Sequence, residues 1–132
     1  MRIIESPSNK QLDLLQAELN EEKNVGIVDI YGPLISFYLA AEDKNSILGV
    51  VGISFDEGDD CAEIYKLYVS PSHRKKGVST FLLKSAIDIL VSKNVKKLYI
   101  ESTDNSRSFW AKNLAKYKCE TYDYNKFSII IG

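Results

Sequence analysis

Two stretches of this chain, residues 34–41 and residues 47–55, are apolar at almost every position. A strand with one solvated face alternates apolar and polar side chains, whereas a strand that is apolar on both alternations must be covered on both faces. The two stretches therefore predict central strands of one sheet, joined as a hairpin that turns at residues 42–46. Helices are expected on both faces of this sheet.

Other periodicities predict the elements around this hairpin. Residues 2–5 form an opening strand, and Ser8 and Gln11 stand at capping-box spacing before a helix that ends by Asn24. Residues 25–30 are ambiguous between a strand and an irregular segment. The later elements expected are a strand at 62–69, a helix at 78–94, a strand at 97–102, a helix at 106–117 and a closing hairpin of 119–124 with 127–131.

This order of elements predicts a mixed α/β fold. No internal repeat, low-complexity tract or linker interrupts the chain, so residues 1–132 are expected to form a single domain. The 17 basic and 18 acidic residues leave a net charge of −1. That balance excludes the global positive field of a dedicated nucleic-acid-binding protein.

Cys61, Cys119 and the single histidine, His73, lie at spacings that fit no ligand set, so no metal is expected. The two cysteines are predicted to be reduced thiols. No segment has the pattern of a secretory signal or reaches the roughly 20 apolar residues that span a bilayer, so a cytoplasmic protein without a membrane partner is expected. The acidic turn at residues 56–60 lacks the length and the closing glutamate of a calcium loop and is predicted to be a solvated hairpin tip.

The most informative junction lies between the strand at 62–69 and the helix that begins at Val78. A basic run at residues 74–76, Arg-Lys-Lys, and Gly77 connect them. N–H groups at a helix start have no partner within the helix, and the helix dipole adds partial positive charge there, so the junction predicts an anion site that suits a diphosphate. Gly77 permits close approach of the backbone, and the basic run attracts phosphate. A solvated basic turn that only caps the helix is the alternative.

Neither the P-loop string nor the dinucleotide-binding glycine string occurs, which excludes nucleotide hydrolysis and hydride transfer. Instead, Val69-Ser-Pro71 precedes Arg74-Lys-Lys-Gly77-Val-Ser79. This pattern resembles the acyl-CoA signature of the GNAT superfamily of N-acetyltransferases, Arg/Gln-x-x-Gly-x-Gly/Ala after Val-x-Pro. The similarity in element order extends from about Leu34 to the C-terminus. Ser79 departs from the pattern, since the family usually has Gly or Ala at this position.

The resemblance implies a mostly antiparallel sheet whose fourth strand splays from the fifth, with the thioester of acetyl-CoA in the opening. It implies that amides of residues 75–80 cradle the pyrophosphate and that the backbone of the fourth strand pairs with the pantetheine arm. The Arg74 side chain is expected to contact phosphate, and Asn105 either contacts pantetheine or caps the last helix. The implied cofactor-binding residues are Leu67, Val69, Arg74, Lys75, Lys76, Gly77, Val78, Ser79, Thr80 and Asn105.

Acetylation of an amine requires a base, because an ammonium group is not a nucleophile. Glu63 and its neighbours resemble the histone-acetyltransferase branch, whose general-base glutamate occupies that position; the alternative is a charge at the solvated strand edge. Glu101 is the second candidate base, or else an ion-pair partner of Lys97 or Lys66. Lys66 and Tyr68 alternate with Glu63 across the two strand faces and are expected to be scaffold.

The family often supplies a tyrosine early in the last helix, within Phe/Leu-Tyr-x-Lys, to protonate the leaving thiolate. Residues 109–112, Phe-Trp-Ala-Lys, fit this pattern with Trp110 in the tyrosine position. An indole N–H is a hydrogen-bond donor but not a useful acid. Matching on Asn105 and Ser108 instead moves the tyrosine position to Lys112.

Three alternatives remain for the leaving group: thiolate that departs unaided, another tyrosine such as Tyr117, or no catalysis. Tyr117 is expected to serve in packing, and His73 is expected to face solvent rather than act as an acid. The leading hypothesis is an N-acetyltransferase in which a neutral amine attacks acetyl-CoA directly, with Glu63 as the catalytic base. A non-catalytic acyl-CoA-binding module of the same fold is the alternative.

The expected acceptor is an amine-bearing small molecule or polypeptide, and Asp56, Asp59 and Asp60 would attract a cationic one. A nucleic-acid partner that uses the basic run is disfavoured by the near-neutral charge. Pairing of hairpin edges between two chains, which would give a homodimer, stays open.

Overall fold

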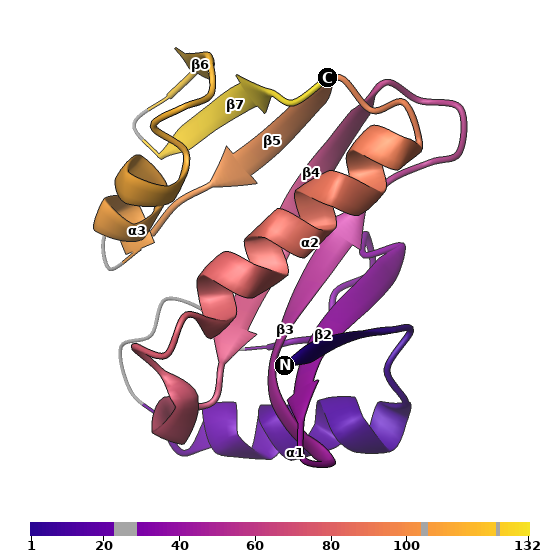
Figure 1. Ribbon diagram of the computed structural model, residues 1–132, viewed down its shortest axis with the longest axis vertical. Helices are drawn as coiled ribbons and strands as arrows, with labels where there is room; N and C mark the ends of the chain where they lie inside the picture. Colours follow the sequence, from indigo (N-terminus) through magenta and orange to yellow (C-terminus); the bar gives the residue numbers. More distant parts are fainter. Residues whose placement is uncertain (23–28, 104–105, 124) are drawn as a thin grey trace.

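The computed structural model describes residues 1–22, 29–103, 106–123 and 125–132. In this part of the chain, seven strands form one sheet in the order β1-β2-β3-β4-β5-β7-β6 (Figure 1). Every neighbouring pair is antiparallel except the parallel pair β4 and β5, so the predicted mixed, mostly antiparallel fold is confirmed. The strands are β1 (Arg2–Glu5), β2 (Phe37–Asp43), β3 (Ser46–Ser54), β4 (Cys61–Val69), β5 (Lys97–Glu101), β6 (Cys119–Thr121) and β7 (Lys126–Ile130).

Helix α1 (Asn9–Asn20) covers one face of the sheet. Its predicted capping box is confirmed: Ser8 Oγ accepts from the Gln11 N–H at 3.1 Å, and Gln11 Oε1 accepts from the Ser8 N–H at 2.8 Å. Both groups satisfy N–H donors that the first helical turn leaves unpaired. The leucines of one helix face, Leu12, Leu15 and Leu19, are buried together with Val50 and Tyr68 of the sheet. The helix ends at Asn20, one turn earlier than the predicted limit, and residues 25–28 of the ambiguous segment lie outside the described part.

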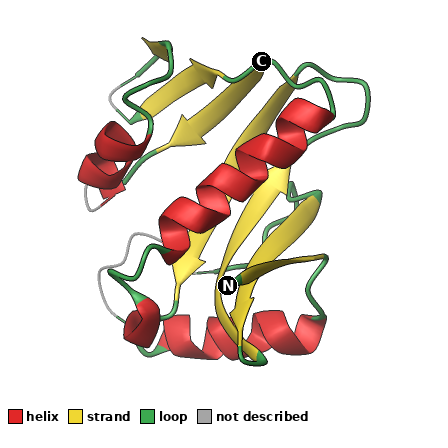
Figure 2. Cartoon of the chain, in the orientation of Figure 1, coloured by secondary structure: helices red, strands yellow, loops and turns green. Residues whose placement is uncertain are grey.

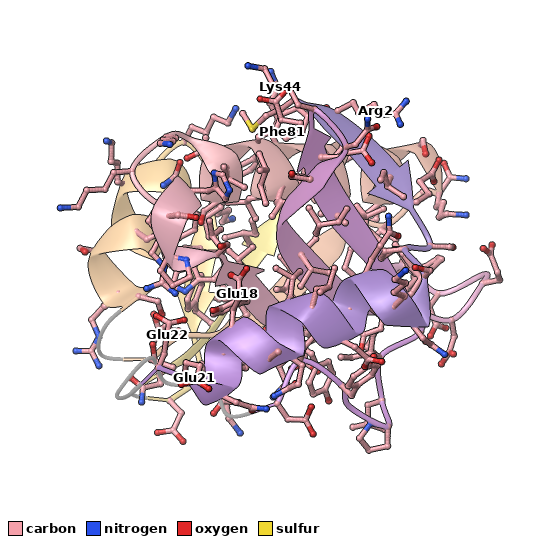
Figure 3. The ribbon with its side chains drawn as sticks, turned by 90° about the horizontal axis from the view of Figure 1, so that it is seen from below. Arg2, Glu18, Glu21, Glu22, Lys44 and Phe81 are labelled. Atoms are coloured by element: carbon pink, nitrogen blue, oxygen red, sulfur yellow. The ribbon has the colours of Figure 1, made fainter. Side chains whose placement is uncertain are left out.

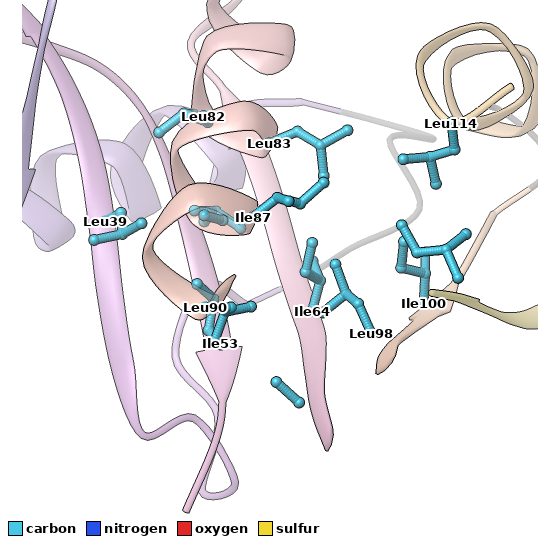
Figure 4. Packing of buried hydrophobic residues seen from close by; sticks show 14 of the residues in the cluster. Leu39, Ile53, Ile64, Leu82, Leu83, Ile87, Leu90, Leu98, Ile100 and Leu114 are labelled. Atoms are coloured by element: carbon cyan, nitrogen blue, oxygen red, sulfur yellow. The ribbon is translucent and has the colours of Figure 1, made fainter. Parts of the chain in front are cut away.

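Helix α2 (Val78–Ser92) crosses the opposite face of the sheet (Figure 2). Its buried side chains, including Leu82, Leu83, Ile87 and Leu90, pack against residues of β2, β3, β4 and β5 (Figure 4). Val51 and Ile53 of β3 belong to this core, whereas Val50 belongs to the core under α1. The apolar runs of the sequence therefore arise because β3 is covered by helices on both faces, as predicted. None of the helices described is both long and apolar enough to cross a membrane.

The hairpin of β2 and β3 turns more tightly than the sequence indicated. Asp43 pairs with Ser46, so only Lys44 and Asn45 form the loop. Both residues have positive φ, 50° and 66°, which is the backbone of a two-residue type I′ hairpin turn. Helix α3 (Arg107–Asn113) is shorter than predicted because the chain leaves the helix at Leu114 in a turn closed by the Tyr117 N–H.

Strand β4 contains a bulge that changes which residues share a face. Gly52 of β3 pairs with Lys66, but Ile53 pairs with Ile64, so Tyr65 is an extra residue in β4. A bulge of this kind shifts the side-chain alternation by one position. The expectation that Lys66 and Tyr68 lie on the face opposite Glu63 is therefore wrong: all three lie on the α1 face. The residues of β4 that pack under α2 are Ala62, Ile64, Leu67 and Val69.

The predicted splay between the fourth and fifth strands is confirmed. Pairing of β4 with β5 runs from Cys61 with Lys97 to Ile64 with Ile100, while β4 continues to Val69. Figure 1 shows β5 turning away from β4 toward α3. The second half of β4 therefore has an edge that β5 does not cover.

Candidate functional site

The turn before α2 is shaped to hold an anion. Gly77 is the N-cap of α2, with φ at +82°, and a Cβ atom placed on it would meet nothing within 4 Å. Glycine adopts this left-handed backbone without the strain that a side chain would add, and the space beside it is open. Lys75 also has a positive φ, 62°, so the turn is wound tightly ahead of the helix. The N–H groups that follow stand at the positive end of a 15-residue helix, where negative charge is stabilised.

A cleft of about 570 Å³ opens between this turn and α3, and we call it the α2–α3 cleft. Seven of the ten residues predicted to bind the cofactor line it, together with His73, which is half-buried rather than solvent-facing. Leu67 and Lys76 are not among the lining residues, and Asn105 lies outside the described part of the chain. The lining consists of Val69, His73, Arg74, Lys75, Gly77, Val78, Ser79, Thr80, Ser108, Phe109, Lys112 and Asn113.

The backbone of β4 leads into this cleft with unpaired hydrogen-bonding groups. The Ser70 N–H donates to the Leu48 carbonyl of β3 at 2.9 Å. Because bonded and non-bonded positions alternate in an antiparallel pair, the N–H and C=O groups of Leu67 and Val69 point away from β3, toward the gap that β5 leaves. Arg74 Nε donates to the Val69 carbonyl at 3.0 Å. The Leu67 groups and the Val69 N–H are therefore placed to pair with an extended ligand.

The Arg74 side chain is held by Glu22, which lies two residues after α1, and by residues of β4. Its guanidinium lies 2.7 and 2.8 Å from the two carboxylate oxygens of Glu22 and 5.6 Å from the centre of the Tyr68 ring. The Tyr68 hydroxyl also donates to Glu22. Figure 3 shows Glu22 beside Glu18 and Glu21 at the end of α1. The guanidinium thus ties the turn before α2 to the segment that follows α1.

These contacts change the acidity of both partners of Arg74. Burial raises the pKa of the Glu22 carboxyl, but the hydrogen bonds from Arg74 and Tyr68 outweigh it, so the net pKa is lowered. Burial and the hydrogen bond to Glu22 raise the pKa of Tyr68. Glu22 therefore stays ionised and Tyr68 stays protonated throughout the neutral range.

Replacing Glu22 by glutamine is expected to lower the free energy of unfolding by about 1 kcal/mol at pH 7, because Arg74 is partly exposed and water screens the pair. A carboxyl whose folded pKa lies below its unfolded pKa stabilises the fold above about pH 4.3, and this stabilisation is lost as the pH falls through the folded pKa. Urea unfolding at pH 7 and at several lower pH values measures this contribution. The difference in the free energy of unfolding between wild type and Glu22→Gln should become smaller below about pH 4.3.

The neighbouring Glu21→Gln variant is the control, since it removes an equal charge from an exposed residue. It should leave the unfolding free energy nearly unchanged at each pH. A Glu22→Gln protein with the same stability as wild type at pH 7 would contradict the role assigned to this contact.

The face of α3 that lines the cleft carries Ser108 and Lys112 but not Trp110. The Trp110 ring is buried, and its Nε1 donates to Ser106 Oγ at 3.1 Å. The sequence left two candidates for the position at which the family often has a tyrosine, Trp110 and Lys112. In the structure Lys112 lines the cleft and Trp110 does not. Asn113 links the two walls, because its Oδ1 accepts from Thr80 Oγ1 at 3.0 Å.

Glu63 lies on the other face of β4, four residues before Leu67. It is half-buried and lines a small cavity of about 180 Å³ together with Asp56, Asp59 and Tyr99. Burial raises the pKa of the Tyr65 phenol, and its hydrogen bond to Glu63 and the charges of Glu63 and Glu101 raise it further. Both candidate bases, Glu63 and Glu101, therefore raise the pKa of Tyr65, which lies at the bulge where β4 begins to diverge from β5.

Three residues of this arrangement were not singled out from the sequence. Glu22 comes from a distant segment and carries no local signal. Tyr65 gains its position from the bulge, which depends on pairing with β3. Asn113 is four residues after Phe109, which does line the cleft, so helical spacing was the one available signal for it.

Among the described residues, no group of three or more His, Cys, Asp or Glu side chains is placed to hold a metal ion. Cys61 and Cys119 are free thiols, half-buried and exposed respectively. Burial and the hydrogen bond to Asp60 raise the pKa of Cys61, which keeps that thiol protonated.

Several solved structures are similar to this one over nearly the whole chain. GCN5 from Tetrahymena has a TM-score of 0.74 at 14% identity, over 100% of this chain and 97% of that one. An acetyltransferase of the GNAT family from Staphylococcus aureus Mu50 has a TM-score of 0.74 at 15% identity, over 99% of each chain. PaiA N-acetyltransferase from Thermoplasma acidophilum, in complex with coenzyme A, has a TM-score of 0.70 at 19% identity, over 98% of each.

No curated protein sequence shows significant similarity to this chain. The sequence model of the acetyltransferase (GNAT) family, however, matches residues 8–115. That match spans α1, the strands β2 to β5, the turn before α2, α2 itself and the whole of α3. The chain therefore belongs to the GNAT family of acetyltransferases.

Proposed function

We propose that this protein transfers an acetyl group from acetyl-CoA to a primary amine. The observation that carries the proposal is the α2–α3 cleft, in which a helix N-terminus and an uncovered strand edge meet. A diphosphate fits the first and an extended amide-containing arm fits the second. Coenzyme A has both parts joined in one molecule, so a single ligand satisfies both halves of the cleft.

In the proposed complex, backbone amides of residues 75–80 bind the pyrophosphate, and the backbone of Leu67 and Val69 pairs with the pantetheine arm. The Leu67 N–H, which points into the gap beside β4, is placed to polarise the thioester carbonyl. Arg74 holds the turn through Glu22 and Val69 rather than by direct contact with phosphate. Lys112, at the cleft wall, adds positive charge near the phosphates.

The acceptor approaches from the face that carries Glu63. Glu63 removes a proton from the ammonium form, the amine nitrogen bonds to the thioester carbon, and the carbon–sulfur bond breaks to release CoA thiolate. After the attack the nitrogen carries one proton more than the amide product, and this proton passes to the departing CoA thiolate or to water as the tetrahedral intermediate collapses, which leaves one N–H on the amide. Acidic side chains at the neighbouring hairpin tip, Asp56 and Asp59, line the same small cavity and favour a cationic acceptor.

A second candidate is a module that binds acyl-CoA without turnover. It is favoured by one observation: α3 presents Lys112 to the cleft where the family often has a tyrosine, and Trp110 is buried in the core. Calorimetric titration with acetyl-CoA, followed by a thiol-release assay over a panel of amines, separates the possibilities. Binding with release of thiol supports the enzyme, binding without release supports the module, and no binding contradicts both.

A further inference from the structure

The turn that carries the proposed diphosphate site has few contacts of its own. In the part of the chain that the structure describes, the N–H groups of Lys75, Lys76 and Gly77 donate no hydrogen bond. Lys75 has a φ of 62°, a left-handed backbone that is unfavourable for a residue with a side chain. The open N–H groups are available to an anion, but the turn needs support from outside to keep its shape.

Arg74, the residue before these open amides, gives the turn that support. Its Nε donates to the carbonyl of Val69, the last residue of β4, at 3.0 Å. Its two terminal nitrogens lie 2.7 and 2.8 Å from the two carboxylate oxygens of Glu22. A guanidinium held by a carboxylate at two points is fixed in orientation as well as in position. The three contacts therefore anchor the first residue of the turn.

Glu22 brings this anchor from a different layer of the fold. It follows α1 by two residues, and its side chain is 15% exposed (Figure 3). The Tyr68 hydroxyl donates to it, and Tyr68 is buried in the core under α1. The centre of the Tyr68 ring lies 5.6 Å from the Arg74 guanidinium carbon. Arg74 itself lines the α2–α3 cleft, so these contacts join the α1 layer to a wall of that cleft.

We propose that Glu22 is a positioning residue for the diphosphate of acetyl-CoA, because it fixes Arg74 and Arg74 fixes the open amides of residues 75–77. The inference rests on the proposed function and adds to it a residue outside the lining of the cleft. A negative charge near an anion site is by itself unfavourable for the anion. If Glu22 acted only through its charge, its removal would strengthen binding. A positioning role predicts weaker binding, so the direction of the effect decides between the two.

Glu22→Gln is expected to raise the Kd for coenzyme A about tenfold, because the turn loses its charge-assisted hydrogen bonds. The KM for acetyl-CoA should rise by a similar factor while kcat stays within about twofold of wild type, because the thioester end of the cofactor loses no contact. A loss of folded protein would instead lower kcat and leave KM unchanged. Calorimetric titration and steady-state thiol release measure these constants, and thermal unfolding checks that both proteins are folded at the assay temperature.

Glu21→Gln is the matched control, since it removes an equal charge from the exposed neighbour and should leave the Kd for coenzyme A unchanged. Arg74→Lys keeps the charge at residue 74 but replaces the fork of a guanidinium by a single nitrogen. It should raise the Kd about as much as Glu22→Gln does. Because both changes break the same contact, the double variant should bind coenzyme A about as well as the weaker-binding single variant.

The outcomes separate a failure of this inference from a failure of the proposed function. Wild-type protein that binds no coenzyme A contradicts the proposed function, and this inference with it. The inference alone is overturned if wild type binds coenzyme A and Glu22→Gln binds it equally well or more tightly. It is also overturned if Glu22→Gln lowers kcat without raising KM, or if its effect on Kd and that of Arg74→Lys multiply in the double variant.

Discussion

Glu63→Gln is expected to lower kcat for acetyl transfer by about 10²–10⁴-fold while the Kd for acetyl-CoA stays within about twofold of wild type. Glutamine keeps the size of the side chain but cannot accept the proton of the attacking ammonium. Glu63 does not line the α2–α3 cleft, so the cofactor loses no contact. Steady-state thiol release and calorimetric titration measure the two quantities.

The matched control is Glu101→Gln, which removes the other carboxylate acting on Tyr65. It should change kcat by less than about tenfold if Glu63 is the base. A reversal of the two effects would move the catalytic role to Glu101. Equal, small effects of both variants would contradict base catalysis from this face of β4. The acceptor concentration must be saturating in each case, so that a loss of acceptor binding is not read as a loss of kcat.

Ser79→Asp is expected to weaken coenzyme A binding by more than about 100-fold, because the new carboxylate would face the pyrophosphate at close range. The same change should raise the free energy of unfolding by about 0.3–1 kcal/mol, since α2 has no acidic residue in its first turn and an anion there complements the helix dipole. Affinity and stability are thus expected to move in opposite directions. Calorimetry with CoA and thermal unfolding of the free protein measure them.

Ser79→Asn, neutral and of the same shape as aspartate, separates charge from size. It should retain most of the affinity, and Ser79→Gly, which restores the usual family residue, should bind at least as tightly as wild type. If Ser79→Asp binds coenzyme A as well as Ser79→Asn does, the pyrophosphate does not lie at the start of α2. That outcome would leave the family membership intact and remove the basis of the proposed site.

Much of this arrangement was accessible from the sequence because its signals are local. The capping box at Ser8 and the apolar face of α2 act through residues three or four apart, so neighbours along the chain decide them. The turn before α2 is equally local: the left-handed backbone at Gly77 follows from the residue itself. The family pattern at residues 69–79 rests on the same short segment, which is why seven of its implied residues meet at one cleft.

Contacts between residues far apart in the chain could not be predicted from such local signals. The bulge at Tyr65 arises from a shift in the register between β3 and β4. This shift places Lys66 and Tyr68 on the same face as Glu63, whereas the sequence predicted the opposite face. The engagement of Arg74 by Glu22 joins residues 52 positions apart. The choice between Trp110 and Lys112 depended on how α3 is rotated against the sheet.

The sequence by itself determined the order of helices and strands, the capping box before α1 and the tight turn before α2, because each depends on backbone preferences and hydrogen bonds within a few residues. Tertiary structure alone decided which face of β4 carries Glu63, where β5 leaves β4, and which side of α3 meets the cleft. Those features depend on the register and packing of segments far apart in the chain, and side-chain periodicity carries no information about register once a strand is bulged.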